Sequence, residues 1–322
     1  MEHAIVSAAG LQGVLSPVLT PFDRTGQPSH ERFVRHCRWL LDQGVGLAVF
    51  GTNSEANSLT VREKRELLDA LVAQQLPTRL MMPGTGACAW PDAVELTRHA
   101  LAVGCAGVLM LPPFYYKGTG DDGLFSYFAR VIEQVGDARL RIYLYHIPPV
   151  TQVPLSLALI ERLLDSFPGV IAGVKDSGGD WAHTEAMIRE FQPRGFDVFA
   201  GSETYLLQTM RAGGTGCITA TANINPTAIL RLYHDWRADD ADAQQAALNH
   251  TRAIFQAYPL IAAMKTAIAW KSGDNDWQQV RPPLSPLAAQ ARRELEDSLA
   301  RAGFDIPAAH RLSMAAAPDS LS

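Results

Sequence analysis

Short apolar runs alternate with longer amphipathic segments along most of this 322-residue chain, and no other feature constrains its fold as strongly. The apolar runs are rich in Val, Ile, Leu, Phe and Tyr, as buried strands are, and they recur at roughly 25 to 35 residue intervals. We place about eight strands, near residues 14–19, 46–50, 80–83, 107–111, 142–146, 170–175, 197–201 and 217–219.

The segments between these runs have the periodicity of helices that bury one face. They cover residues 30–42, 61–74, 93–102, 124–133, 157–164, 182–191 and 205–211. Thr60, followed three residues later by Glu63, predicts a capping box at the start of one helix. Strands buried on both faces and separated by helices predict a (β/α)8 TIM barrel rather than an open doubly wound sheet. No GxGxxG follows the first strand, which weakens the dinucleotide-binding alternative.

Short apolar runs typical of strands do not occur after Pro226, and residues 227–303 have the pattern of helices. We therefore expect a catalytic barrel over residues 1–225 and a helical C-terminal extension over 226–310, packed on the barrel. The last segment, 311–322, ends in AAAPDSLS and is expected to be a disordered tail.

Composition excludes several classes of function. The chain has 28 Lys and Arg against 33 Asp and Glu, without a long basic block, so a nucleic-acid or anionic-membrane surface is not expected. Neither a secretory signal nor a run of about 20 apolar residues is present, which predicts a cytoplasmic protein. The four cysteines form no CxxC pair and are expected to be reduced. A small molecule is the expected partner.

One lysine ends an otherwise apolar strand, in the stretch GVKDSGGD at residues 173–180. Barrel active sites lie at the carboxyl ends of the strands, and an apolar setting there favours the free amine, which is a nucleophile toward carbonyls. From its position alone, Lys175 could equally pair with Asp176. Tyr145 ends the preceding strand and could shuttle protons. His146 points to the other side of that strand and is expected to pack or to support the site.

Two turns have the composition of anion sites. The turn at residues 51–55 offers backbone N–H groups and short polar side chains, which can hold a carboxylate without a cation. Glycines within 211–226 keep a phosphosugar enzyme among the alternatives, although no Lys or Arg follows them in that loop. Strand ends carry no HExxH, DxD or His-x-His cluster, and no GxSxG is present, so neither a metal site nor a serine triad is expected.

Six motifs then occur together in a definite order: GTNSE, GTGA, PPFYY, YHIP, GVKDSGGD and GGTGCIT. In their order and spacing the chain resembles, over about residues 12–300, the dihydrodipicolinate synthase and N-acetylneuraminate lyase superfamily. The resemblance implies a class I, Schiff-base enzyme on a (β/α)8 barrel with a helical C-terminal part, commonly a homotetramer. It also implies that pyruvate, or the pyruvyl half of a 2-oxo acid, forms an imine with a lysine and that no cofactor is needed.

Carried over by position, the resemblance makes Lys175 the imine-forming lysine and Tyr145 the proton-shuttling tyrosine. Thr52 corresponds to the hydroxyl that relays protons, and Thr52 with Asn53 to the turn that binds the carboxylate.

Further positions of the family pocket are Gly201 and Ile218, whose backbone groups line it. Tyr115, or its neighbour Tyr116, corresponds to the tyrosine that reaches across a dimer interface into the next site.

Departures from the family patterns bear on the substrate. Val150 stands where dihydrodipicolinate synthases have an arginine for the second substrate's carboxylate, and Gly201 to Thr204 only partly match the acidic residues of sialic acid lyases. Asn53 together with KDSGGD is closer to 4-hydroxy-2-oxoglutarate aldolases and 2-oxo-3-deoxy sugar acid lyases or dehydratases. We expect a class I aldolase or lyase with pyruvate as donor or product and an aldehyde as the other reactant. A dihydrodipicolinate synthase, a dehydratase using the same imine and a non-catalytic 2-oxo acid sensor are the alternatives.

Overall fold

Parallel strands form the centre of the computed structural model, which describes residues 5–7 and 10–314. Strands β2 (Gly10–Ser16), β8 (Gly216–Ile218), β7 (Asp197–Ala200), β6 (Ile171–Asp176), β5 (Ile142–His146) and β4 (Val108–Met110) pair in that order. On its other side β2 pairs in parallel with β3 (Gly46–Leu47). The predicted TIM barrel is thus confirmed, with an antiparallel strand β1 (Ile5–Ser7) added beside β2.

The strand predicted at 80–83 is the least regular member of the ring. The bridges Leu47↔Met81 and Gly84↔Leu109 join it to β3 and β4, and Leu80 itself belongs to the 3-10 turn η3 (Thr78–Leu80). Pro83 has no N–H to donate, which removes one hydrogen bond on the side of β4, while Met82 and Gly84 still donate to the carbonyls of Leu47 and Val49.

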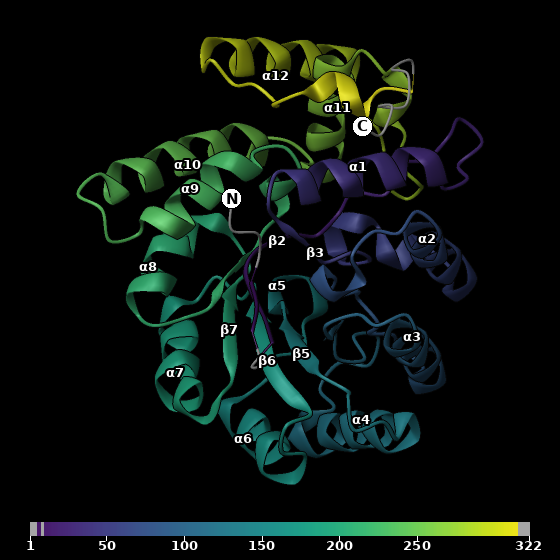
Figure 1. Ribbon diagram of the computed structural model, residues 1–322, viewed down its shortest axis with the longest axis vertical. Helices are drawn as coiled ribbons and strands as arrows, with labels where there is room; N and C mark the ends of the chain where they lie inside the picture. The colour runs from purple at the N-terminus through teal and green to yellow at the C-terminus, as the bar shows by residue number, and fades with distance from the viewer. Residues whose placement is uncertain (1–4, 8–9, 315–322) are drawn as a thin grey trace.

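Helices surround the strands, as Figure 1 shows. Each helix predicted between the strands is present, with its ends displaced by at most a few residues. The capping box of Thr60 and Glu63 is present at the start of α2. The sequence pattern missed β1 and the short helix α5 (Pro148–Thr151), which has a single turn and so no periodicity to detect. The outer helices are α1 (His30–Asp42), α2 (Val61–Ala73), α3 (Trp90–Ala102), α4 (Gly120–Val135), α6 (Leu157–Ser166), α7 (Trp181–Phe191) and α8 (Leu206–Arg211).

The C-terminal helices lie together beside α1 (Figure 1). They are α9 (Pro226–Asp235), α10 (Ala241–Gln256), α11 (Leu260–Ser272) and α12 (Ala289–Arg301). The tail predicted to begin at 311 is wrong for its first residues, because Leu312 is fully buried and its carbonyl accepts a hydrogen bond from Trp277 Nε1 at 3.0 Å. The rest of that prediction, 315–322, lies outside the described residues.

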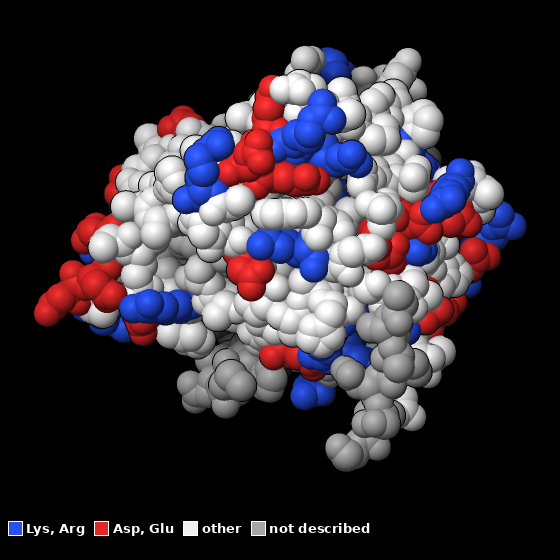
Figure 2. Space-filling model, turned by 90° about the horizontal axis from the view of Figure 1, so that it is seen from above, with Lys and Arg blue, Asp and Glu red and all other residues white. Residues whose placement is uncertain are grey.

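Charged side chains of both signs are interspersed on the face seen from above in Figure 2. A surface of this kind provides no single-sign field that would attract a polyanion. Across residues 5–7 and 10–314, no helix is long and apolar enough to cross a membrane.

A buried carboxylate lies at the amino-terminal end of the barrel, opposite the strand ends where catalysis is expected. Asp197, the first residue of β7, accepts hydrogen bonds from Tyr143 Oη and Thr215 Oγ1, both at 3.2 Å, and from Gln12 Nε2 at 3.5 Å. Burial raises the pKa of Asp197 to about 6, although these hydrogen bonds act in the opposite direction.

We expect the contribution of Asp197 to the free energy of unfolding to fall as the pH rises from about 4 to about 6. Native Asp197 holds its proton more tightly than the unfolded chain does, so its contribution is present below pH 3.8 and lost as the pH passes 6. The loss is on the order of 3 kcal/mol for a shift of about two pKa units. Asp197→Asn cannot titrate and should lack this slope in urea unfolding measured across that range at one protein concentration. Equal slopes in variant and wild type would contradict the raised pKa.

Candidate active site

The register of β5 against β6 places Tyr145 directly beside Lys175. Lys175 Nζ donates to Tyr145 Oη at 3.3 Å and lies 4.4 Å from the centre of the same ring. Only 1% of the lysine and 2% of the tyrosine is exposed. The lysine that interrupts the apolar strand is therefore inside the barrel, against a phenol.

Thr52 extends this contact across the barrel. It begins the 3-10 turn η1 (Thr52–Ser54), just after β3, and its Oγ1 lies 3.2 Å from Tyr145 Oη. Thr52, Tyr145 and Lys175 thus form a continuous chain of hydrogen bonds. Such a chain can carry a proton to and from a group held near the lysine nitrogen.

Two residues in left-handed conformation bracket the turn that carries Thr52. Phe50 has φ 63° and Glu55 has φ 56°, a conformation that costs a residue other than glycine about 1–2 kcal/mol. Inside the turn, Ser54 Oγ accepts the Gly51 N–H at 3.1 Å, and the Ser54 carbonyl accepts Thr20 Oγ1 at 2.7 Å. The surrounding structure therefore imposes the shape of the turn.

A small cavity opens beside this turn. Its volume is about 10 Å³, roughly the space of one water molecule. Thr52 and Tyr145 are on its wall, whereas Lys175 and Asn53 are not. The complete lining is Phe50, Gly51, Thr52, Ala56, Asn57, Gly84, Gly86, Leu109, Leu111 and Tyr145.

The other pocket positions expected from the sequence lie at the same end of the barrel. Gly201 follows β7 and donates its N–H to the Asp176 carbonyl at 2.7 Å; a Cβ there would lie 1.9 Å from Ser177 Oγ, so no side chain fits. Ile218 ends β8 and is fully buried, and Asn53 follows Thr52 in the turn, half-buried.

Tyr115 stands apart from this group within the single chain. Tyr115 and Tyr116 are 74% and 65% exposed, in the loop between β4 and α4, and their rings contact edge to face at 5.3 Å. The structure does not bring either tyrosine to Lys175.

His146 and Asp176 occupy the opposite side of the same two strands, as the alternation of side chains predicts for His146. His146 Nδ1 lies 2.8 Å from Asp176 Oδ1, which also accepts the Gly178 N–H at 2.8 Å, while Thr184 Oγ1 donates to the other oxygen. Burial raises the pKa of Asp176, but these hydrogen bonds outweigh it and leave the pKa below its usual value. Asp176 therefore pairs with His146, and not with Lys175.

Sequence reasoning missed two buried ion pairs near the site. Glu203, three residues after the end of β7, accepts hydrogen bonds from Thr219, Thr221 and Arg252, the last at 3.1 Å. Its carboxylate is therefore not free to bind the hydroxyl groups of a sugar-like substrate. Glu55, in the turn itself, pairs with Lys265 of α11. Lys265, in the middle of the apolar helix LIAAMKTAIAWK, was the available signal, of the same kind that singled out Lys175.

In the part of the chain that the structure describes, no three His, Cys, Asp or Glu side chains are grouped so that they could hold a metal ion.

The chain also resembles known proteins over most of its length. Residues 10–302 match the model of the dihydrodipicolinate synthetase family. The chain is 32% identical over 282 residues to an uncharacterized DapA-like lyase of Chloroflexus aurantiacus, which covers 86% of this chain and 92% of that protein.

Two solved structures are similar over nearly their whole length. A dihydrodipicolinate synthase from Agrobacterium tumefaciens has a TM-score of 0.83 at 30% identity, with 90% of this chain and 98% of that chain covered. YagE, a prophage protein of the dihydrodipicolinic acid synthase family from E. coli in complex with pyruvate, has a TM-score of 0.81 at 28% identity, with coverage of 91% and 99%.

Replacing Lys175 by Met should stabilise the protein, by about 1–3 kcal/mol, because the buried Lys175 nitrogen exchanges its hydration for a hydrogen bond of 3.3 Å to Tyr145. Lys265→Met is the matched control and should destabilise, since it leaves Glu55 buried without its cation. Thermal unfolding of the three proteins at one pH and concentration measures both effects. A lower Tm for Lys175→Met would mean that the contacts of the Lys175 nitrogen stabilise the fold.

Proposed function

We propose, from the premise that the chain belongs to the dihydrodipicolinate synthetase family, that it cleaves or forms a carbon–carbon bond in a 2-oxo acid with pyruvate as product or donor. Membership makes it a class I aldolase-like lyase. More specifically, we propose a 4-hydroxy-2-oxoglutarate aldolase or a 2-oxo-3-deoxy sugar acid aldolase. The imine chemistry is supported by the chain of hydrogen bonds from Lys175 through Tyr145 to Thr52.

In the proposed mechanism the neutral Lys175 amine attacks the ketone carbon of the 2-oxo acid. Tyr145 Oη, 3.3 Å from the amine, donates a proton to the departing oxygen, and water leaves as the imine forms. The protonated imine withdraws electrons: as Tyr145 takes back a proton from the hydroxyl group on the adjacent carbon, the carbon–carbon bond breaks, an aldehyde leaves and an enamine remains. Protonation of the enamine and addition of water release pyruvate and restore the amine.

The turn after β3 is the proposed carboxylate site. Backbone N–H groups of Thr52 and Asn53 and their side chains supply donors without a cation. Backbone groups at Gly201 and Ile218 complete the pocket in this proposal.

The assembly is part of the same proposal. Tyr115, or Tyr116 beside it, would enter the site of a second copy, and the high exposure of both rings in one chain supports such a contact. A homotetramer or dimer in the cytoplasm is the state we propose. The division into a barrel over 1–225 and a helical region over 226–310 likewise stays a proposal.

One feature supports an aldehyde half without a carboxylate of the aspartate semialdehyde type. Val150, on α5, is apolar and 61% exposed, and it stands where the synthases have an arginine for that carboxylate. The alternative, a 4-hydroxy-tetrahydrodipicolinate synthase, is supported by relatives of that name, such as the one of Thermus thermophilus at 31% identity. A dehydratase and a 2-oxo acid sensor stay as further alternatives.

Incubation with pyruvate followed by borohydride should leave a reduced pyruvyl adduct on Lys175, located by peptide mass spectrometry and absent from Lys175→Ala. A folded wild-type protein without the adduct would contradict the proposal. Products from candidate 2-oxo acids then separate the alternatives: pyruvate with an aldehyde indicates a lyase, and a dehydrated oxo acid indicates a dehydratase. Condensation of pyruvate with aspartate semialdehyde would instead indicate the synthase, and an adduct without turnover would indicate the sensor.

Tyr145→Phe should slow the exchange of pyruvate methyl protons for deuterium by about a hundred-fold, because the variant lacks the hydroxyl that moves protons at the imine. Nuclear magnetic resonance follows this exchange without knowledge of the aldehyde. Tyr143→Phe is the matched control, since that hydroxyl binds Asp197 at the other end of the barrel. Equal rates in Tyr145→Phe and wild type would exclude the proposed role of Tyr145.

A further inference from the structure

We propose that the buried ion pair of Glu55 and Lys265 sets the position of the Thr52–Asn53 turn, so that the C-terminal helical region takes part in binding the pyruvyl carboxylate. Both are positioning residues, since they act through the turn. The inference rests on the function proposed above and adds to it a contribution from residues outside the barrel.

Glu55 lies where a side chain is costly for the backbone. It ends η1 and precedes the 3-10 turn η2 (Ala56–Ser58), with φ 56° and ψ 34°, a conformation that glycine adopts without penalty. A glutamate in that position needs contacts that offset the conformational free energy of the left-handed backbone. The Glu55 carboxylate makes those contacts.

Both oxygens of that carboxylate bind the C-terminal region. Oε1 accepts a hydrogen bond from Lys265 Nζ, and Oε2 accepts the Arg281 backbone N–H at 2.9 Å. The side chains of Glu55 and Lys265 are fully buried. Lys265 Nζ also donates to the Gln279 carbonyl at 2.8 Å, so one ammonium joins the turn to α11 and to the segment that follows it.

The aromatic ring of Phe22 lies beneath this contact. Lys265 Nζ is 4.6 Å and the Arg281 guanidinium carbon 4.8 Å from its centre. Burial lowers the pKa of Lys265 to about 8, while Glu55 acts to raise it. Taking away Glu55 therefore removes the group that favours the charged lysine.

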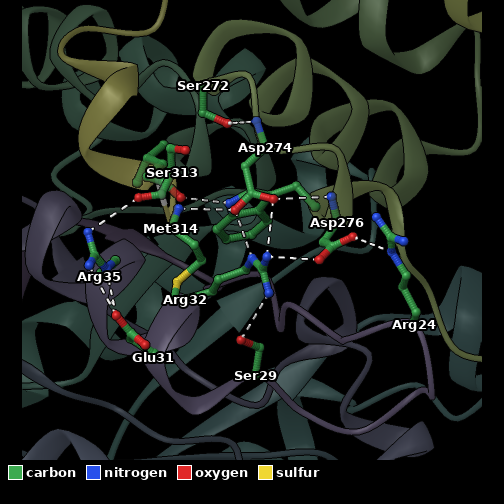
Figure 3. A network of polar contacts seen from close by, with 12 residues as sticks. Arg24, Ser29, Glu31, Arg32, Arg35, Ser272, Asp274, Asp276, Ser313 and Met314 are labelled. Atoms are coloured by element: carbon green, nitrogen blue, oxygen red, sulfur yellow. Dashed lines mark hydrogen bonds and ion pairs between the residues drawn. The ribbon is translucent and has the colours of Figure 1, made fainter. Parts of the chain in front are cut away.

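The segment 274–281 is itself anchored at two ends, so it can serve as a fixed support. At one end Arg32 donates to Asp274 at 2.9 Å and to Asp276 at 3.0 Å, and Arg24 binds Asp276 at 2.9 Å (Figure 3). At the other end the Arg281 guanidinium binds Glu63, near the start of α2, and the carbonyls of Gly26 and Ser58.

The two ends of the turn are held by different forces. Phe50 packs its ring against Phe33 at 6.1 Å, an apolar contact of low directionality. Glu55 is held by charged hydrogen bonds, whose geometry is directional. A buried ion pair is seldom more stabilising than apolar packing of the same volume. We therefore assign this pair the role of fixing the orientation of the turn. A displacement of about 1 Å would break the 3.2 Å contact between Thr52 and Tyr145.

The test compares Lys265→Met and Glu55→Gln with wild type and with Arg32→Met as the matched control. Arg32→Met loosens the same C-terminal segment at its far end and leaves the contacts of Glu55 in place. The probe is pyruvate: the concentration for half-maximal adduct on Lys175 is measured by borohydride trapping at a temperature well below every Tm. Methyl-proton exchange at saturating pyruvate is measured in parallel.

We expect half-maximal trapping to need about ten-fold more pyruvate in Lys265→Met and in Glu55→Gln, and to change less than about two-fold in Arg32→Met. The double variant should be no worse than the poorer single variant, because the two residues act as one unit.

Unchanged pyruvate dependence in folded Lys265→Met and Glu55→Gln, with only a lower Tm, would overturn the inference. An equal loss in Arg32→Met would overturn it too, because general loosening would then suffice. If Lys265→Met does not fold, Glu55→Gln decides alone, since it keeps the volume of the side chain and loses one of its two acceptors. A wild-type protein that traps no pyruvate would instead refute the proposed function itself.

Discussion

The parallel pairing of β5 and β6 is the constraint on which the rest of the site depends. It sets Tyr145 opposite Lys175 and, one residue further, His146 opposite Asp176. Successive side chains of a strand point to opposite faces, so the first pair faces the barrel interior and the second faces the helices. A slip of one residue in either strand would exchange these faces and destroy both contacts.

Among the residues that the structure describes, this separation leaves no carboxylate paired with the buried Lys175. Asp176 is the carboxylate nearest to Lys175 in sequence, but His146, Thr184 and Gly178 occupy its oxygens on the outer face. Lys175 instead meets the neutral hydroxyl of Tyr145. The Lys175 nitrogen is therefore placed beside the hydroxyl that the proposed mechanism uses to move protons.

Ion pairs and hydrogen bonds connect the C-terminal region to the loops around Lys175. Lys265 and Arg281 reach the turn that carries Thr52, and Arg252 of α10 binds Glu203 beside β7. Two loops at the catalytic end of the barrel are thus held by residues that follow it in the chain. In the barrel itself, by contrast, apolar burial and backbone pairing determine the arrangement.

The sequence by itself determined the barrel and the nature of its site. Alternating apolar runs and amphipathic segments are local patterns, and Lys175 and Tyr145 stand out because polar residues end apolar strands. Only the tertiary structure decided how the charges pair. Lys175 could have bound Asp176 by sequence alone, and Glu55 is separated from Lys265 by 210 residues. The packed position of 311–312 against α1 and the 3-10 turn η7 (Asn275–Gln278) was equally hidden. Contacts between distant segments depend on how the whole chain packs, and no local pattern of residues records them.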